Sequence, residues 1–180
     1  GLGSLHALKQ LGPASVPPQL HAVEYRPTPN LQKGSLVRAV ASACMDTSDG
    51  ALATLDQLMR LNHVGFVVSQ DTTLHPAARR LADHAQLPPW MMLAGLHGEF
   101  ELMFTVSPDR ADELMSRASA QGWSPIEIGH VVSTPGVWID DETGRTELDT
   151  GSIRNLFAET PGDIGVCIHY LKTMGEPCTQ

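Results

Sequence analysis

Amphipathic stretches alternate with short apolar runs along this chain, and that alternation constrains its fold more than any other feature. Apolar residues at helical spacing predict helices over about residues 31–42, 51–62 and 75–86. Between the last two, the apolar run at residues 64–68 has the length and β-branched character of a buried strand. Interleaved helices and strands predict an α+β domain with a mixed, largely antiparallel sheet flanked by helices.

The second half of the chain adds further elements of both kinds. Ser107-Pro108-Asp109 predicts the start of a helix that Gly122 closes. Residues 126–132 and 137–139 predict two strands joined in the manner of a hairpin, and a turn at 141–144 predicts a return into a third strand. The antiparallel character of the predicted sheet rests on these strands.

Charge and cysteine content narrow the partners. The 180 residues carry 20 acidic and 12 basic side chains, a formal net charge of -8 without a cluster of Lys and Arg, which argues against a nucleic-acid partner. A phosphorylated small molecule needs a divalent cation to mediate its contact with such a surface. The three cysteines show no CxxC spacing and no run has the length of a membrane span, so we expect a cytoplasmic protein without a membrane partner.

Met45 to Gly50, reading MDTSDG, is the best candidate for chemistry. Asp46, Ser48 and Asp49 place two carboxylates and a hydroxyl in a tight turn where a helix begins, and Ser48 or Asp49 can cap that helix. Amides at a helix start favour anions and carboxylates favour cations, so a magnesium–phosphate pair satisfies both. An ordinary capped helix explains the same pattern.

A second candidate lies at residues 97–102, reading HGEFEL. On a strand, Glu99 and Glu101 point to one face and Phe100 to the other. Paired acids on one face can bind a substrate amine or assist proton transfer. The alternative is a solvent-facing edge of a half-buried strand.

These two segments resemble motifs of the thiamine-monophosphate kinases. Residues 45–50 and the Ala/Leu-rich helix after them are similar to the family's MD-x-SDG motif, and residues 99–105, reading EFELMFT, resemble its GGEDYELxFT segment. The resemblance covers about residues 1–149 and matches the second half of such a kinase. Three shorter segments fall in the order that the family shows, namely 1–3, 26–29 and 128–132.

The resemblance implies a fold and a reaction. It implies a domain like the C-terminal domain of aminoimidazole ribonucleotide synthetase over residues 1–157, with a C-terminal extension at 158–180. Such a domain is half of a longer chain, which forms a homodimer through an N-terminal domain that supplies most ATP and metal ligands. The reaction implied is magnesium-dependent transfer of the ATP γ-phosphoryl group to thiamine monophosphate.

The resemblance also implies roles for individual residues. Asp46 and Asp49 correspond to magnesium ligands and Ser48 to an ATP contact. Glu99 takes the place of a substrate-binding acid if one residue is deleted relative to the family's GGED, which reads Leu96-His97-Gly98-Glu99 in this chain. An aromatic residue near the family's C-terminus has no counterpart at residues 151–157.

Two other functions fit the same residues. One is a domain of an ATP-dependent synthetase related to aminoimidazole ribonucleotide synthetase, and the other is a non-catalytic module that binds a nucleotide or metabolite. Because most ATP and metal ligands are implied for the N-terminal domain, we expect the isolated chain to be inactive as a kinase.

Overall fold

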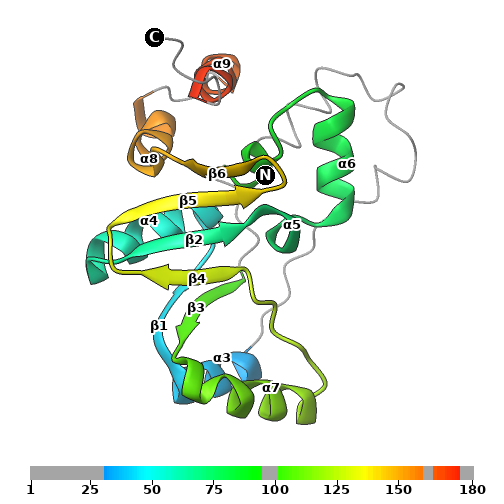
Figure 1. Cartoon of the computed structure of the whole chain (residues 1–180), viewed down its shortest axis with the longest axis vertical. Helices are drawn as coiled ribbons and strands as arrows, with labels where there is room; N and C mark the ends of the chain where they lie inside the picture. The colour runs from blue at the N-terminus through cyan, green and yellow to red at the C-terminus, as the bar shows by residue number, and fades with distance from the viewer. Residues whose placement is uncertain (1–30, 95–100, 160–163, 175–180) are drawn as a thin grey trace.

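The computed structural model describes residues 31–94, 101–159 and 164–174 (Figure 1). The helices are α3 (Leu31–Val40), α4 (Ala51–Asn62), α5 (Gln70–Thr73), α6 (Pro76–His84), α7 (Ala111–Ala120), α8 (Thr150–Glu159) and α9 (Ile164–Met174), with short 3-10 helices η2 (Pro89–Leu93) and η3 (Pro108–Arg110). The strands are β1 (Ala41–Asp46), β2 (Gly65–Ser69), β3 (Leu102–Val106), β4 (Gly129–Val132), β5 (Gly136–Asp141) and β6 (Gly144–Glu147). Among the described helices, none has the length and apolar character needed to cross a membrane.

The strands form two sheets. The four-stranded sheet has the order β4-β2-β5-β6, in which β2 is antiparallel to β4 and parallel to β5, and β5 is antiparallel to β6. A separate two-stranded sheet pairs β1 with β3 antiparallel. The prediction of an α+β fold with a mixed, largely antiparallel sheet is therefore confirmed.

Two local predictions were wrong. The helix expected over residues 31–42 ends at Val40, and the next six residues form β1. The strands β4 and β5 are not hairpin partners, because β2 lies between them. All but the last residue of β2 are buried, and a strand of that kind needs a neighbour on each edge. The hairpin formed by β5 and β6 is as expected.

A main core joins the four-stranded sheet to the helices. In Figure 1, α4 lies behind this sheet, and its buried side chains Leu52, Leu55 and Leu58 belong to the same cluster as residues of β2, β5 and α6. Cys167 and Leu171 of α9 are also buried in it. The division of the chain at residue 157 stays a prediction.

A second, smaller core lies at the other end of the described structure. There α3 and α7 pack together through Leu36, Val40, Leu114 and Ala118, with Phe104 of β3 against them (Figure 1). In β3, Met103 packs against the main core, whereas Phe104 and Val106 pack against the smaller one. Ala43 and Met45 of β1 pack against the main core, so the short two-stranded sheet connects the two parts of the fold.

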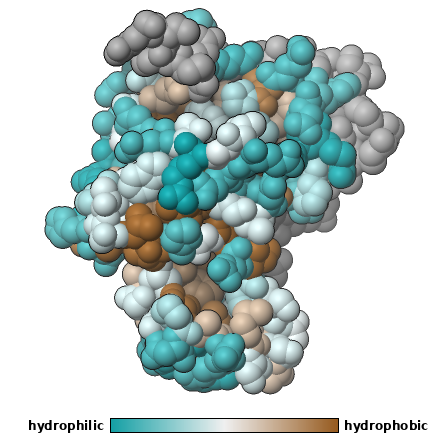
Figure 2. Space-filling model, in the orientation of Figure 1, coloured by the Kyte–Doolittle hydropathy of each residue, from teal (hydrophilic) through white to brown (hydrophobic). Residues whose placement is uncertain are grey.

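The other face of the four-stranded sheet carries a large aromatic side chain. The Trp138 ring lies so close to Gly65 and Gly136 that a Cβ atom on either would stand less than 3 Å from it. Figure 2 shows hydrophilic side chains over much of this side of the molecule, with brown apolar patches near its middle. The two glycines are thus explained by packing under Trp138 and need no functional reading.

Candidate functional site

The candidate turn sits where β1 passes into α4. Side chains alternate along β1 between half-buried and exposed, and Asp46 is exposed at its last position. Thr47 is then buried, Ser48 is half-buried and Asp49 is exposed, before α4 begins at residue 51. The short connection thus carries the two predicted carboxylates to the protein surface between two elements packed in the core.

Gly50 determines the shape of the turn. Its φ is +96° and its ψ is 156°, a region essentially restricted to glycine. Its N–H donates to the carbonyl of Thr47 at 3.0 Å, which closes the turn. Gly50 is also the N-cap of α4, and no side chain caps this helix. The expectation that Ser48 or Asp49 caps the helix is therefore wrong, because Gly50 occupies the cap position itself.

The Asp46 carboxylate is held by its own turn. The Ser48 N–H donates to Asp46 Oδ1 at 3.0 Å. Hydrogen bonds from the Ser48 hydroxyl and from its N–H lower the pKa of Asp46, so the group is ionised at neutral pH. Across the described residues, neither Asp46 nor Asp49 forms an ion pair with a basic side chain. Both carboxylates therefore remain available to a cation.

The neighbouring thiol does not suit nucleophilic catalysis. Cys44 is exposed two residues before Asp46. Although the residue is exposed, partial desolvation of its sulfur and, to a smaller extent, the negative charge of Asp46 raise its pKa. A raised pKa disfavours the reactive thiolate. The turn is therefore unsuited to chemistry that needs the Cys44 thiolate.

The structure places Glu101 and Leu102, the end of the second predicted segment, next to the turn. Asp46, at the end of β1, is opposite Leu102, at the start of β3. Just beyond this pair, the Thr47 N–H donates to the Glu101 carbonyl at 3.0 Å. Glu101 is exposed and precedes β3, so the expected strand alternation through this residue does not apply. Glu99 lies outside the described residues.

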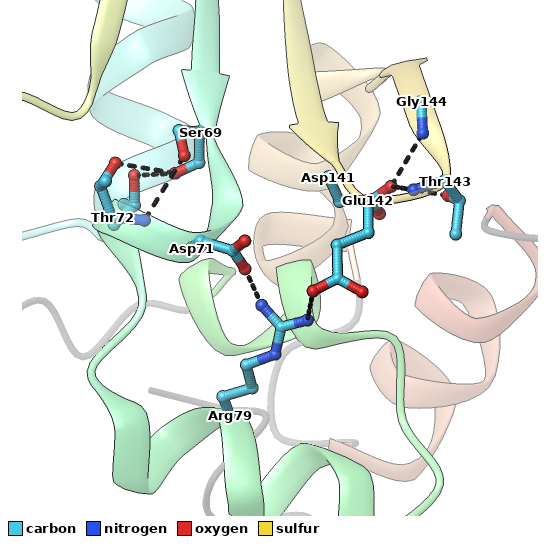
Figure 3. A network of polar contacts seen from close by, with 9 residues as sticks. Ser69, Asp71, Thr72, Arg79, Asp141, Glu142, Thr143 and Gly144 are labelled. Carbon is cyan, nitrogen blue, oxygen red and sulfur yellow. Dashed lines mark hydrogen bonds and ion pairs between the residues drawn. The ribbon is translucent and has the colours of Figure 1, made fainter.

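A second group of acidic side chains has the basic partner that the acids of the turn lack among the described residues. Where β2 and β5 end, Asp71 and Glu142 both pair with Arg79 (Figure 3). The nearby Asp141 carboxylate accepts the Thr143 N–H at 2.8 Å and is thereby also engaged by its own chain. Asp71 and Glu142 thus have a cationic partner, which Asp46 and Asp49 lack in the described structure, while Asp141, like Asp46, is held by its own turn.

The turn does not form a complete metal site from described residues. In residues 31–94, 101–159 and 164–174, no group of three or more His, Cys, Asp or Glu side chains is arranged to hold a metal ion. Asp46 and Asp49 fit the part of a magnesium site that protein carboxylates supply, since Mg²⁺ commonly takes one or two carboxylates together with waters and phosphate oxygens.

Two buried threonines at this turn were not singled out from the sequence. Thr47 is 5% exposed and Thr54 is 2% exposed, and both hydroxyls bond to the backbone of the turn or of Glu101. For Thr54 the sequence did hold a signal, since it interrupts the apolar stripe of an otherwise amphipathic helix. Thr47 lies in a turn, where a threonine is ordinary.

Comparisons with known proteins place this α+β arrangement in a class. No family model matches the chain. The solved structure of thiamine-monophosphate kinase from Stenotrophomonas maltophilia K279a superposes with a TM-score of 0.59 at 27% identity, covering 77% of this chain and 46% of that one. Escherichia coli HypE, a hydrogenase maturation protein, shares the fold with a TM-score of 0.54 at 21% identity, covering 66% of this chain and 39% of HypE. The fold resembles that of the C-terminal region of thiamine-monophosphate kinase.

Within that class, the sequence is partly similar to thiamine-monophosphate kinases. The kinase of Buchnera aphidicola (subsp. Acyrthosiphon pisum) is 32% identical over 89 residues, which is 49% of this chain and 27% of the kinase. The kinase of Salmonella typhimurium is 34% identical over 82 residues, or 45% of this chain and 25% of that protein. The matched part of the chain thus spans only about a quarter of the length of these relatives.

A ligand-bound structure has the same fold. AaThiL complexed with AMPPCP and TMP superposes with a TM-score of 0.56 at 20% identity, covering 81% of this chain and 46% of AaThiL. At that identity the match establishes the shared fold. The presence of both ligands is a property of AaThiL.

Proposed function

We propose that this chain is the C-terminal domain of an ATP- and magnesium-dependent small-molecule kinase, which transfers a phosphoryl group from ATP to thiamine monophosphate or a related acceptor. The observation that carries the proposal is the pair of exposed carboxylates, Asp46 and Asp49, at the strand-to-helix turn. It is supported by the partial similarity to thiamine-monophosphate kinases, of which AaThiL carries AMPPCP and TMP.

In this proposal each residue of the turn has a limited task. Asp46 and Asp49 bind Mg²⁺, and Ser48 contacts ATP. The metal ion neutralises charge on the phosphate oxygens as the phosphoryl group moves. Such direct transfer depends on positioning and charge neutralisation, so it requires no covalent nucleophile. The raised pKa of Cys44 agrees with that chemistry.

The proposal extends to parts beyond the turn. Glu99 contacts the acceptor, the role that the resemblance to thiamine-monophosphate kinases implies for it. An N-terminal domain completes the ATP site, the whole protein is a cytoplasmic homodimer, and residues 158–180 form an extension to the domain. The isolated chain then has no kinase activity. Magnesium-dependent ATP turnover by the purified 180-residue chain above a heat-treated control contradicts this part.

Manganese as a paramagnetic stand-in for Mg²⁺ tests the metal turn directly. In ¹⁵N-labelled chain, low concentrations of Mn²⁺ with AMPPCP should broaden the amide signals of Ser48 and Gly50 before others. Asp46→Asn with Asp49→Asn should remove that effect, because the two substitutions replace both charged ligands by neutral amides. The spectrum of the variant shows whether the fold is retained.

The matched control changes acids that already have a basic partner. Asp71→Asn with Glu142→Gln also removes two negative charges, from the group around Arg79. It should leave the broadening at Ser48 and Gly50 intact. If both double variants reduce the broadening equally, Mn²⁺ binding depends only on the net charge of the protein. That result, or broadening centred elsewhere in the wild-type chain, contradicts the assignment of Asp46 and Asp49.

A further inference from the structure

Thr47 connects the acidic turn to the strand beside it. Its hydroxyl accepts the Glu101 N–H at 3.0 Å and lies 3.4 Å from the Glu101 carbonyl, and its own N–H donates to that carbonyl at 3.0 Å. Thr47 is only 5% exposed, so the Glu101 N–H that it binds has little alternative in water. The residue therefore sets where the turn lies relative to the start of β3.

Thr54 holds the same turn from the helix side. Its hydroxyl is 3.0 Å from the carbonyl oxygen of Asp46 and 3.0 Å from that of Gly50. The bond to Gly50 is the usual return of a helical threonine to the carbonyl four residues earlier. The bond to Asp46 is different, because it spans the whole connection and ties the last residue of β1 to the first turn of α4.

We propose that Thr47 and Thr54 are positioning residues, which together hold the backbone between Asp46 and Gly50 so that this one short turn presents the exposed carboxylates of Asp46 and Asp49 as ligands. The ligand role of the two acids rests on the proposed function. The positioning role of the two threonines rests on the hydrogen bonds alone. Neither threonine touches a reacting group. Each acts through the backbone that carries the acids.

The two threonine hydroxyls are buried, so they bond to the protein backbone and not to water. A buried hydroxyl is retained at low cost only where its hydrogen bonds are made. Here the partners are carbonyls and an amide at the two ends of one connection, Asp46, Gly50 and Glu101. Because both threonines hold one short segment, their effects on it should be coupled rather than additive.

Hydrogen exchange of the turn amides tests the positioning, without dependence on any ligand. Thr47→Val removes the acceptor of the Glu101 N–H, and Thr54→Val removes the bond to the Asp46 carbonyl. We expect the Glu101 amide to exchange faster in Thr47→Val and the Gly50 amide to exchange faster in Thr54→Val. The expected change is about fivefold, as for the loss of one hydrogen bond. Thr47→Ser and Thr54→Ser keep the hydroxyl and should restore slow exchange.

Thr150 provides a matched control. It is 3% exposed, and its hydroxyl donates to Asp56 Oδ1 at 3.2 Å, away from the turn. Thr150→Val should lower the unfolding midpoint without faster exchange at Gly50 or Glu101. Exchange that is unchanged in both threonine variants of the turn, or raised as much by Thr150→Val, overturns the positioning role.

Mn²⁺ titration of the same variants then links position to binding. Thr47→Val and Thr54→Val should each raise the Mn²⁺ dissociation constant at the turn about fivefold, and the serine variants should restore it. Unchanged affinity despite faster exchange overturns the link to ligand placement. If the wild-type chain binds no Mn²⁺ at the turn, the ligand role of Asp46 and Asp49 in this chain is contradicted, while the exchange result still decides whether the threonines position the segment.

Discussion

The acids of the turn before α4 and the acid within α4 differ in exposure and in their partners. Asp46 and Asp49, before the helix, are exposed and have no basic partner among the described residues. Asp56, within the helix, is 1% exposed and pairs with Arg154 of α8. Its other oxygen accepts the hydroxyl of Thr150 at 3.2 Å. Carboxylates seven and ten residues apart in sequence thus meet opposite surroundings.

The difference separates acids that hold the fold from acids offered to a ligand. A buried carboxylate is tolerated because its charge and lone pairs are matched, and here the match joins α4 to α8. An exposed carboxylate without a counter-ion contributes little to stability, and it is free to bind a cation. The group around Arg79 in Figure 3 lies between these cases, since its acids are exposed but paired.

Removing the buried acid should have the largest effect on stability. Asp56→Ala leaves Arg154 without its partner, and breaking a buried pair on one side costs several kcal/mol. Because Arg154 is 29% exposed and water can reach it, we expect a loss near the lower end, about 3 kcal/mol. Urea unfolding followed by circular dichroism measures it. A loss as small as that of Asp46→Asn would erase the distinction between the two regions.

A substitution in the turn backbone should come next. Gly50→Ala forces a side chain into the conformation at φ +96° and ψ 156°, at a cost of about 2 kcal/mol. Gly151→Ala is the control, because Gly151 lies in α8 and a Cβ there would only touch Asp149 at an ordinary 3.5 Å. That variant should be neutral or stabilising. Equal unfolding midpoints for the two variants would show that the turn adapts and that Gly50 does not determine its shape.

The smallest expected effect concerns an exposed acid that caps a helix. The Asp149 carboxylate accepts hydrogen bonds from the Ser152 N–H at 2.9 Å and from the Ser152 hydroxyl at 2.6 Å. Both lower the pKa of Asp149, and the bond from the hydroxyl has the larger effect. A lowered pKa in the folded state gives stability that is present above the unfolded pKa and is lost as pH falls through the folded value. Asp149→Ala should cost about 1 kcal/mol at neutral pH.

The pH dependence gives this test its control. The cost of Asp149→Ala should shrink in acid, where the wild-type carboxyl becomes protonated. Asp149→Asn keeps a capping oxygen and cannot titrate, so its unfolding midpoint should fall less between neutral pH and acid than that of the wild type. If Asp149→Ala costs the same at both pH values, the carboxylate form of Asp149 adds nothing to stability. Because Ser48 holds the Asp46 carboxylate in the same way, we would then expect no stabilising effect from the charge of Asp46 either.

The sequence predicted an element well wherever the hydrophobic pattern of that element lies within its own residues. The leucines of α4 and the apolar run of β2 predicted a helix and a strand close to those observed. It was a poor guide for β1, whose alternation between half-buried and exposed residues follows directly on a helix with no Gly or Pro between them. The partners of β4 and β5 were also mispredicted, since local pattern indicates a strand but not its neighbour.

By itself, the sequence determined the kinds of element, the α+β class and the presence of Asp46, Ser48 and Asp49 in a turn before a helix. Only the tertiary structure decided that this turn lies beside Glu101, that Gly50 rather than Ser48 or Asp49 caps α4, and that Thr47 is buried. The physical reason is that propensity and periodicity act over a few residues. Burial and the partner of a hydroxyl depend instead on segments such as residue 101, 54 positions away from Thr47.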